Sequence, residues 1–359
     1  MFSRLYPVFT ALILLLVGSA PLPAQQFHFR NYSVGEGLAQ SQVFSLLEDS
    51  RGYLWMGTRG GGISRFDGRT FQTYTSRDGL VNNYIFTIYE DAQGHLWIGT
   101  NHGVSRYDGN EFETVPLFSD SIQYSVSCVL QDSGGAYWFG TNRGLYRLQG
   151  GSIQPFWSGK APIGPRITSL LEDPLGRICI GHDRGVTIID GDSVITYGRA
   201  DGLSQQSVEC LMVGPDSNLW MGTYGGGINR LEDGQFQQLY PGSTRDSRTV
   251  LSLLTDRHGN VWAGTVGEGV FRWSPADSSF TQLTEVDGLA NNHVRSLLED
   301  AVGNLWIGTS GGGVSQYSGQ QFLHYDQFSG LPRQVCLFRV PGQPRAPLDG
   351  HVRAGCHPV

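Results

Sequence analysis

The stretch Leu54-Trp55-Met56-Gly57-Thr58 decides the fold, because it returns six more times along a chain of 359 residues. Six of the seven copies keep the tryptophan, and the fourth has cysteine in its place. The residues at this position are Trp55, Trp97, Trp138, Cys179, Trp220, Trp262 and Trp306. The steps between them are 42, 41, 41, 41, 42 and 44 residues. Self-similarity at such a period indicates a repeat architecture.

The first repeat has the pattern of four short strands. Residues 43–47 and 53–58 are mainly apolar and are separated by a turn at 50–52. Asp67-Gly68 is a hairpin signal between residues 63–66 and residues 71–74. Four antiparallel strands in about 42 residues are the unit of a β-propeller blade. The sequence therefore predicts an all-β fold, a seven-bladed β-propeller of four-stranded antiparallel blades.

The residues at the tryptophan position are predicted to be structural. A tryptophan side chain carries about 150–250 Å², worth roughly 4–6 kcal/mol when a neighbouring blade covers it. An aspartate lies six residues before this position in six copies, where it is expected to cap a tight turn. A row of aspartates also suggests calcium, but the turn interpretation is favoured. The fifth copy has Gly214 instead and is expected to turn around Pro215-Asp216.

Composition argues against several functional classes. A net charge of −7 and the lack of a Lys/Arg run argue against a nucleic-acid partner. No pair of histidines has metal spacing and no serine lies in a Gly-x-Ser-x-Gly motif, so no metal, cofactor or catalytic residue is predicted. Cys128, Cys179 and Cys210 are expected to be small buried residues. Cys336 and Cys356 lie in an irregular tail.

Three segments are predicted along the chain. Residues 1–24 have Arg4, an apolar core over 8–17 and a cleavage-like site before Gln25, as in a secretory signal peptide. The protein is therefore expected to be exported, to a periplasmic or extracellular location. Residues 25–332 form the propeller. Residues 333–359 are an anomalous tail, interpreted either as an out-of-frame continuation of the repeats or as a disordered segment.

The order of strands in the seventh blade is ambiguous in the sequence. Residues 27–38 repeat the end of a blade, so this strand is expected to close the ring by pairing into the seventh blade. Residues 322–325 are a competing fourth strand. The simplest resolution is that residues 322–325 lead on to an eighth repeat outside the ring.

The repeats resemble the two-component regulator propeller family. The resemblance rests on the pattern Glu-Asp-x-x-Gly-x-Leu-Trp-x-Gly-Thr at 48–58, 90–100 and 299–309, and on Asp-Gly-Leu-x-x-Asn at 78–83 and 287–292. It covers roughly residues 27–331. The resemblance implies a periplasmic sensor propeller of a bacterial histidine-kinase-type receptor, partnered by a second propeller or a signalling domain. No membrane helix or kinase follows here, so the chain is expected to be a truncated fragment.

The loops between the second and third strands, with the links between blades, are predicted to form the binding face. These loops are long and glycine-rich in blades one, five, six and seven, and shorter and more functionalised in blades two, three and four. The candidate ligand-binding residues form an arc in blades two to four, with Trp157 as the one aromatic for stacking on a sugar and arginines to pair with carboxylate or sulfate. They are Asn101, His102, Asn142, Arg143, Trp157, Lys160, Arg166, Asp183 and Arg184.

The arc would suit a carbohydrate ligand, especially an acidic oligosaccharide. This is a hypothesis, and the interpretation of these residues as ordinary solvated loop residues is favoured over it. A free exported carbohydrate-binding or protein-interaction propeller is the alternative function. A propeller lyase or hydrolase is less favoured; it would use His102 and His182, which are expected to face the same rim. The oligomeric state is not determined by the sequence.

Overall fold

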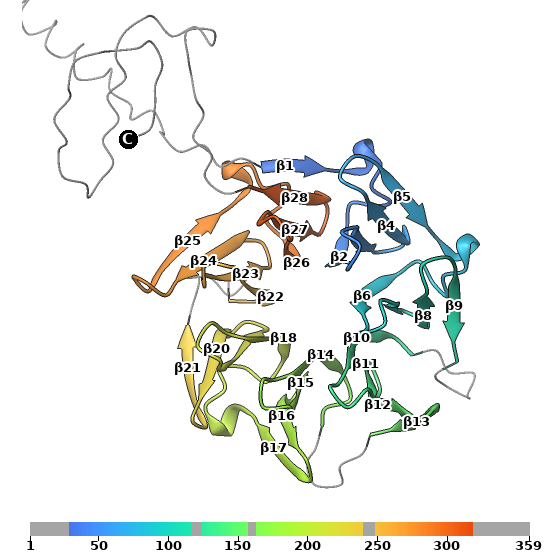
Figure 1. The fold of residues 1–359 in the computed structure, drawn as a ribbon. Coiled ribbons are helices and arrows are strands. Elements are labelled where there is room, and N and C mark those ends of the chain that lie inside the picture. Colours follow the sequence, from blue (N-terminus) through green and yellow to red (C-terminus); the bar gives the residue numbers. More distant parts are fainter. Residues whose placement is uncertain (1–28, 117–123, 157–162, 240–247, 319–359) are drawn as a thin grey trace, which may run out of the picture. The chain divides into compact units, whose positions relative to one another are not determined.

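The computed structural model describes residues 29–116, 124–156, 163–239 and 248–318. They form seven four-stranded antiparallel sheets arranged as blades around a ring (Figure 1), which confirms the predicted fold. Within blades one to six the strands follow one another in chain order from the inside outward. The 28 strands are connected by turns, links and four short 3-10 helices.

The strand bounds repeat closely from blade to blade. Blades one to three comprise β2 (Val43–Glu48), β3 (Leu54–Thr58), β4 (Ile63–Phe66), β5 (Phe71–Tyr74), β6 (Ile85–Glu90), β7 (Leu96–Thr100), β8 (Gly103–Tyr107), β9 (Phe112–Val115), β10 (Val126–Gln131), β11 (Tyr137–Thr141), β12 (Gly144–Gln149) and β13 (Ser152–Pro155). Blades four and five comprise β14 (Ile167–Glu172), β15 (Ile178–His182), β16 (Gly185–Asp190), β17 (Ser193–Tyr197), β18 (Val208–Val213), β19 (Leu219–Thr223), β20 (Gly227–Glu232) and β21 (Gln235–Leu239).

The last two blades follow the same pattern, with the first strand of the chain in blade seven. They comprise β22 (Val250–Thr255), β23 (Val261–Thr265), β24 (Val270–Ser274), β25 (Ser279–Leu283), β26 (Val294–Glu299), β27 (Leu305–Thr309), β28 (Val314–Tyr317) and β1 (Phe29–Tyr32). The 3-10 helices in the links are η1 (Val34–Glu36), η2 (Ser76–Asp78), η3 (Arg199–Asp201) and η4 (Glu285–Asp287).

Strand β1 closes the ring as the fourth strand of blade seven. It pairs antiparallel with β28, with Tyr32 opposite Val314. The Tyr32 ring stacks on Trp306 of the same blade at 5.5 Å and meets Phe66 of blade one edge-on at 5.2 Å. The first and last repeats are therefore joined by both backbone and aromatic contacts, as expected for the N-terminal strand. The competing strand at 322–325 lies outside the described residues.

The hydrophobic core is divided among the junctions between blades. Trp55 of blade one is fully buried and packs in one cluster with Ile85, Ile98 and Tyr107 of blade two. Gly57 lets these blades approach, because an added Cβ would lie 2.6 Å from the Cγ2 of Ile85. All seven residues at the tryptophan position are buried.

The repeated aspartates hold the tryptophans as well as the turns. Asp49 accepts the backbone N–H groups of Arg51 and Tyr53, as predicted, and its Oδ2 also accepts the indole N–H of Trp55 at 2.9 Å. The same indole bond is made by Asp91, Asp132, Asp256 and Asp300, at 2.7–2.8 Å. In blade four, where cysteine replaces the tryptophan, Asp173 instead binds the guanidinium of Arg177.

The fifth blade preserves the indole bond by a different turn. Asp216 lies four residues before Trp220, and its Oδ1 accepts the indole N–H at 2.9 Å. Ser217 takes the left-handed backbone conformation, with φ 63°, where all six other turns have glycine at the same place. The expected turn around Pro215-Asp216 is therefore confirmed.

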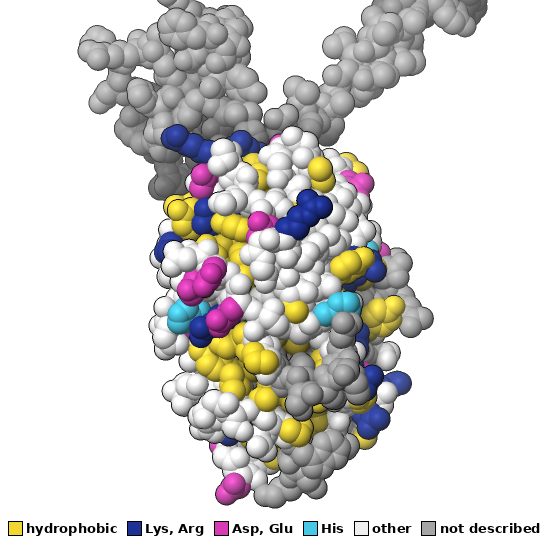
Figure 2. Space-filling model, turned by 90° about the vertical axis from the view of Figure 1, so that its right-hand side faces the viewer, with side chains coloured by type: hydrophobic (Ala, Val, Ile, Leu, Met, Phe, Trp, Pro, Cys, Tyr) yellow, Lys and Arg dark blue, Asp and Glu magenta, His cyan; other side chains and the backbone are white. Residues whose placement is uncertain are grey.

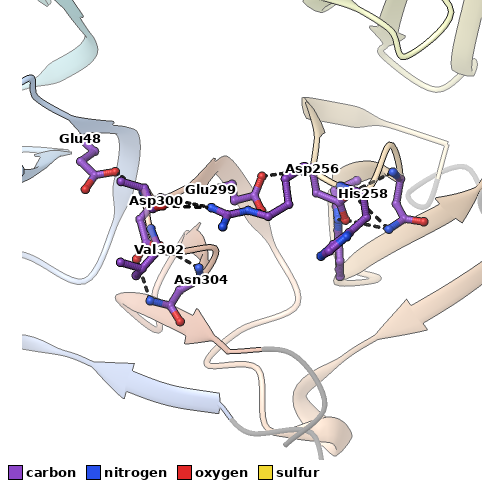
Figure 3. Close-up of polar contacts among 11 residues, drawn as sticks. Glu48, Asp256, His258, Glu299, Asp300, Val302 and Asn304 are labelled. Atoms are coloured by element: carbon purple, nitrogen blue, oxygen red, sulfur yellow. Dashed lines mark hydrogen bonds and ion pairs between the residues drawn. The ribbon is translucent and has the colours of Figure 1, made fainter.

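Five of the seven blade junctions carry a further polar contact, which we call the latch. In each, a Glu or Gln that ends an innermost strand accepts the N–H of the residue after the turn aspartate in the preceding blade. The pairs are Ser50 with Glu90, Ala92 with Gln131, Ser133 with Glu172, Arg257 with Glu299 and Ala301 with Glu48, at 2.7–3.0 Å. Figure 3 shows the latches of Glu299 and Glu48.

The two remaining junctions, on either side of blade five, have proline at the donor position. Pro174 and Pro215 carry no backbone N–H, and the acceptor positions hold Val213 and Thr255 instead of Glu or Gln. A Glu or Gln acceptor thus ends the innermost strand at every junction where the preceding blade offers a backbone N–H donor, and it is absent at both junctions where proline removes that donor.

The remaining sequence predictions divide between described and undescribed residues. Cys128 and Cys179 are buried free thiols, as expected, and Cys210 is a partly buried free thiol packed against the hydrophobic cluster of blades five and six. Burial raises the pKa of each thiol to about 12. The signal segment at 1–24, the tail at 333–359 with Cys336 and Cys356, and the boundaries at 25 and 332 lie outside the described residues and stay predictions.

Candidate functional site

The antiparallel order of the strands gives the ring two different faces. The turns between first and second strands and between third and fourth strands lie on one face, with the latches. The loops between second and third strands and the links between blades lie on the other, which we call the loop face. In the first blade it carries residues 59–62. The division into long and short loops agrees with the sequence prediction.

The inner end of the loop face is held in the same way in every blade. The first residue of each second-to-third loop donates its N–H to the carbonyl of the residue just before the innermost strand, at 2.8–3.2 Å. The loop residues are Arg59, Asn101, Asn142, Asp183, Tyr224, Val266 and Ser310. Their acceptors, the lead-in residues, are Gln42, Tyr84, Ser125, Arg166, Ser207, Thr249 and His293.

A third set of residues completes this inner rim. All seven innermost strands shift register between their first and third residues, so the second residue forms a β-bulge outside the regular pairing. The bulge residues are Phe44, Phe86, Ser127, Thr168, Glu209, Leu251 and Arg295. All seven are partly exposed, whereas the residue before each of them is buried.

The bulge residues contact the neighbouring blades. The rings of Phe44 and Phe86 stack at 6.2 Å, and the guanidinium of Arg295 lies 4.8 Å from the Phe44 ring centroid. Ser127 and Thr168 donate to carbonyls of the next blade. The bulge residues therefore link blades seven, one and two by aromatic and cationic groups, and blades three, four and five by small polar ones.

The sequence analysis missed the bulge residues because each lies inside a run that reads as apolar. A signal was present: in seven aligned repeats the flanking positions stay hydrophobic or small, while this one is Phe, Phe, Ser, Thr, Glu, Leu and Arg. Variation at one position within a uniform structural repeat points to a role other than packing.

The predicted arc is partly assembled on the same rim. Asn101, Asn142 and Asp183 are loop residues of consecutive blades. The Asn101 Oδ1 accepts the hydroxyl of Ser125 at 2.8 Å, and the Asn142 Oδ1 accepts the Ser125 N–H, so both amides help to hold the loops. The Asp183 Oδ1 is buried without a hydrogen-bond partner among the described residues.

The three described arginines of the arc differ in their surroundings. Arg143 is exposed and lies over the Tyr124 ring, 5.7 Å from its centroid. Arg184 is exposed. Arg166 turns to the next blade, where it forms an ion pair of 2.7 Å with Glu209. Trp157 and Lys160 lie outside the described residues, so the stacking aromatic of the arc stays a prediction.

The expectation that His182 faces the rim is wrong. His182 is fully buried, its Nδ1 accepts the N–H groups of Gly164 and Arg184, and its Nε2 bonds Thr187. Two donors at Nδ1 require the neutral ring with hydrogen on Nε2. Burial lowers its pKa to about 4. His182 occupies the place of the final threonine of the repeat motif, so its role is structural.

His102, the second histidine of the lyase or hydrolase hypothesis, is also fixed by contacts with neighbouring side chains. Its Nδ1 lies 2.9 Å from the side-chain amide of Asn82, and its Nε2 lies 3.4 Å from that of Asn101. Both ring nitrogens therefore have side-chain amide partners, one in the link before β6 and one in the loop itself. The pair of rim histidines required by a lyase or hydrolase hypothesis is not assembled.

The rest of the described surface offers fewer free groups. Two open hollows, of about 260 and 550 Å³, lie on the latch face beside Glu48 and Glu90, whose carboxylates are already bonded. No group of three metal-ligating side chains occurs in the described ranges.

Figure 2 shows the side of the ring with β5 and β9, where charges of both signs are interspersed with small hydrophobic areas. No described helix is long and apolar enough to cross a membrane.

Three segments of the chain, residues 37–60, 79–102 and 288–311, match the family model described as two component regulator propeller. They include the second strands and loops of blades one, two and seven. A comparison with curated proteins finds no match.

Solved structures share the fold at low sequence identity. The extracellular domain of a hybrid two component system from B. thetaiotaomicron aligns with a TM-score of 0.70 and 22% identity over 81% of this chain and 42% of its own. PorZ, a surface component of the type-IX secretion system of Porphyromonas gingivalis, aligns with a TM-score of 0.65 and 16% identity over 79% and 47%. This chain thus spans less than half the length of either.

A third neighbour is an enzyme. A streptogramin B lyase aligns with a TM-score of 0.67 and 12% identity, over 81% of this chain and 97% of the lyase. Identity this low establishes a shared propeller fold and carries no activity from one chain to the other.

Proposed function

We propose that this chain, whose repeats are those of the two component regulator propeller family, is an exported ligand-sensing ring of a two-component-type receptor. The observation that carries the proposal is the inner rim of the loop face. There the backbone is the same in seven blades, while the side chains differ from blade to blade. A fixed scaffold with variable groups on one face is typical of a binding surface.

The proposed ligand is a small acidic molecule, with an acidic oligosaccharide as the first choice. Arg143 and Arg184 are exposed on the loop face, and guanidinium groups pair bidentately with carboxylate or sulfate. The Arg143 guanidinium lies over the buried Tyr124 ring, which helps to position it on this face. A second propeller or signalling domain is the proposed protein partner, in keeping with the family.

Binding without turnover is part of the proposal. The two histidines that a rim-based lyase would need are held by structural contacts, and His182 is buried. The fold shared with a streptogramin B lyase does not supply the missing groups.

The test is a binding screen of the purified chain against sulfated, uronate-containing and neutral oligosaccharides, with product analysis of every mixture. We expect saturable binding of an acidic member, no product, and loss of binding in the double variant Arg143→Ala with Arg184→Ala. Product formation that depends on His102 would contradict the sensing role. Unchanged binding in the double variant would show that the arc in blades two to four is not part of the binding site.

A further inference from the structure

Two arginines of neighbouring blades lie over one aromatic ring on the inner rim. The guanidinium of Arg295, the bulge residue of blade seven, is 4.8 Å from the Phe44 ring centroid, and that of Arg59, the loop residue of blade one, is 6.0 Å from it. Strands β2 and β26 are neighbours around the ring. The chain thus brings two cations, separated by more than 230 residues of sequence, to the same ring.

Neither arginine has a carboxylate partner within 4.0 Å among the described residues. The Nε of Arg295 donates to the Ser310 hydroxyl at 3.1 Å, and one Nη of Arg59 reaches the Gln42 side-chain oxygen at 3.5 Å. Each guanidinium has five N–H donors, so most of them have no acceptor in the described part of the chain.

Six other arginines, in the first-to-second turns or on third strands, pair with a nearby acid, whereas Arg65 and Arg272 on third strands have no acid partner in the part of the chain that the structure describes. The ion pairs are Arg51 with Asp49, Arg106 with Glu113, Arg147 with Asp132, Arg177 with Asp173, Arg230 with Asp216 and Arg257 with Glu299. Arg59 and Arg295 are not among these ion-paired arginines, and the two share one aromatic ring across a blade junction.

The electrostatics of the rim leave this positive charge uncompensated. Burial lowers the pKa of Arg295, and the neighbouring charge of Arg59 lowers it further, while Glu209 opposes both. Glu209 is itself held by Arg166 at 2.7 Å and by the Ser207 hydroxyl at 2.7 Å. An anion placed at the two guanidiniums would relieve their repulsion.

Two nearby features suit a ligand. The Phe86 ring stacks beside Phe44 and extends the apolar surface next to the cations. The Nε2 of His293, the lead-in residue of blade seven, is buried and has no hydrogen-bond partner in the described ranges. Burial and the charge of Arg295 lower the pKa of this histidine, which favours its neutral form.

We infer that Arg59 and Arg295, over the face of Phe44, form a binding site for the oxyanion group of a small ligand, a carboxylate or a sulfate. The two guanidiniums supply charge and paired donors. The rings of Phe44 and Phe86 contact the flat body that carries the oxyanion. The inference rests on the proposed function and deepens it by adding, to the arginines of blades two to four, an oxyanion site at blades one and seven.

The test is calorimetric titration of the whole chain with sodium glucuronate and, separately, sodium sulfate, at constant ionic strength set by chloride. Glucose is the uncharged control ligand. The variants are Arg295→Gln and Arg59→Gln, and the matched control is Arg199→Gln, an exposed arginine in η3 at the outer edge of the ring. Circular dichroism checks that each variant folds. Because Arg59 is exposed, Arg59→Gln is expected to fold and can test the site even if Arg295→Gln does not fold.

We expect glucuronate, sulfate or both to bind more tightly than glucose. Each rim substitution should raise the Kd about tenfold or more, while Arg199→Gln stays within about twofold. Equal Kd values in Arg59→Gln and the unmodified chain would overturn the inference. If binding instead disappears in Arg143→Ala with Arg184→Ala and survives in Arg59→Gln, the sensing role stands and this site falls. If no oxyanion binds, this site falls, and the oligosaccharide screen tests the sensing role independently.

Discussion

The backbone N–H of Ser50 in blade one donates to the carboxylate of Glu90 in blade two, 2.8 Å from its Oε2, and the Ser50 hydroxyl adds a second bond to Oε1. This contact crosses a blade junction and fixes the spacing of two consecutive repeats. We expect Glu90→Ala to lower the free energy of unfolding by about 1–2 kcal/mol, since both donors lose a charged acceptor. Glu90→Gln should cost less, because Gln131 makes the same latch with an amide oxygen.

The measurement is urea unfolding followed by tryptophan fluorescence. The control is Glu113→Ala, which removes a carboxylate that is paired on the outer surface of the same blade. Equal losses for Glu90→Ala and this control would show that the latch adds nothing beyond a surface ion pair.

The two junctions with proline allow the latch to be built instead of removed. Val213→Glu alone should not stabilise the chain, because Pro174 has no N–H to donate. Combined with Pro174→Ala, it should show a favourable coupling energy of about 0.5–1.5 kcal/mol in a double-mutant cycle. The two single variants serve as the controls, and additive effects in urea unfolding would count against the proposed origin of the missing latches.

His182 predicts a pH dependence of stability. Its pKa is about 4 in the folded chain, lowered from 6.5 mainly by burial. The folded state therefore holds the neutral ring, and its contribution is complete above about pH 6.5. As the pH falls from there to about 4 the unfolded chain gains a proton that the folded chain does not, which costs up to about 3 kcal/mol.

The check compares urea midpoints at several values between pH 7.5 and 4.5 for the unmodified chain and for His182→Gln. The variant should lose part of the slope in this window, even if it is less stable at every pH. Parallel curves for the two proteins would show that His182 does not titrate as its burial requires.

The three described cysteines should be unreactive in the native ring. Burial raises the pKa of Cys128, Cys179 and Cys210 to about 12, and the thiolate is the reactive form. Iodoacetamide at pH 8 should leave the peptides that contain them unmodified, and the same treatment in urea should label all three. Mass spectrometry of the separate peptides distinguishes these sites, and native labelling of Cys179 would contradict its place in the blade junction.

Much of the architecture could be predicted because one sequence unit repeats. The motif around Trp55 and Gly57 predicted the four-stranded blade, and its seven copies predicted a ring of seven blades. The indole bond of Asp49 and the latch of Glu90 were not foreseen, since both join residues whose distance depends on the folded turn or on the next blade. Local sequence signals predict a turn but not which side chain reaches across a junction.

The candidate site was less predictable for the same reason. The loop face follows from strand order, and Asn101, Asn142 and Asp183 do lie on its inner rim. The pairing of Arg59 with Arg295 could not be derived, because it depends on the β-bulge and on the closure of the ring. His182 was misplaced because its burial depends on Gly164 and Thr187, which are set by the fold of blade four.

The proposed binding of an acidic ligand at the inner rim of the loop face can be tested by a crystal structure of the chain grown with sodium glucuronate. We expect a carboxylate bound by the guanidiniums of Arg59 and Arg295, with the sugar ring against Phe44 or Phe86. A saturated complex whose ligand lies only on the latch face, or on the outer surface of the blades, would contradict it.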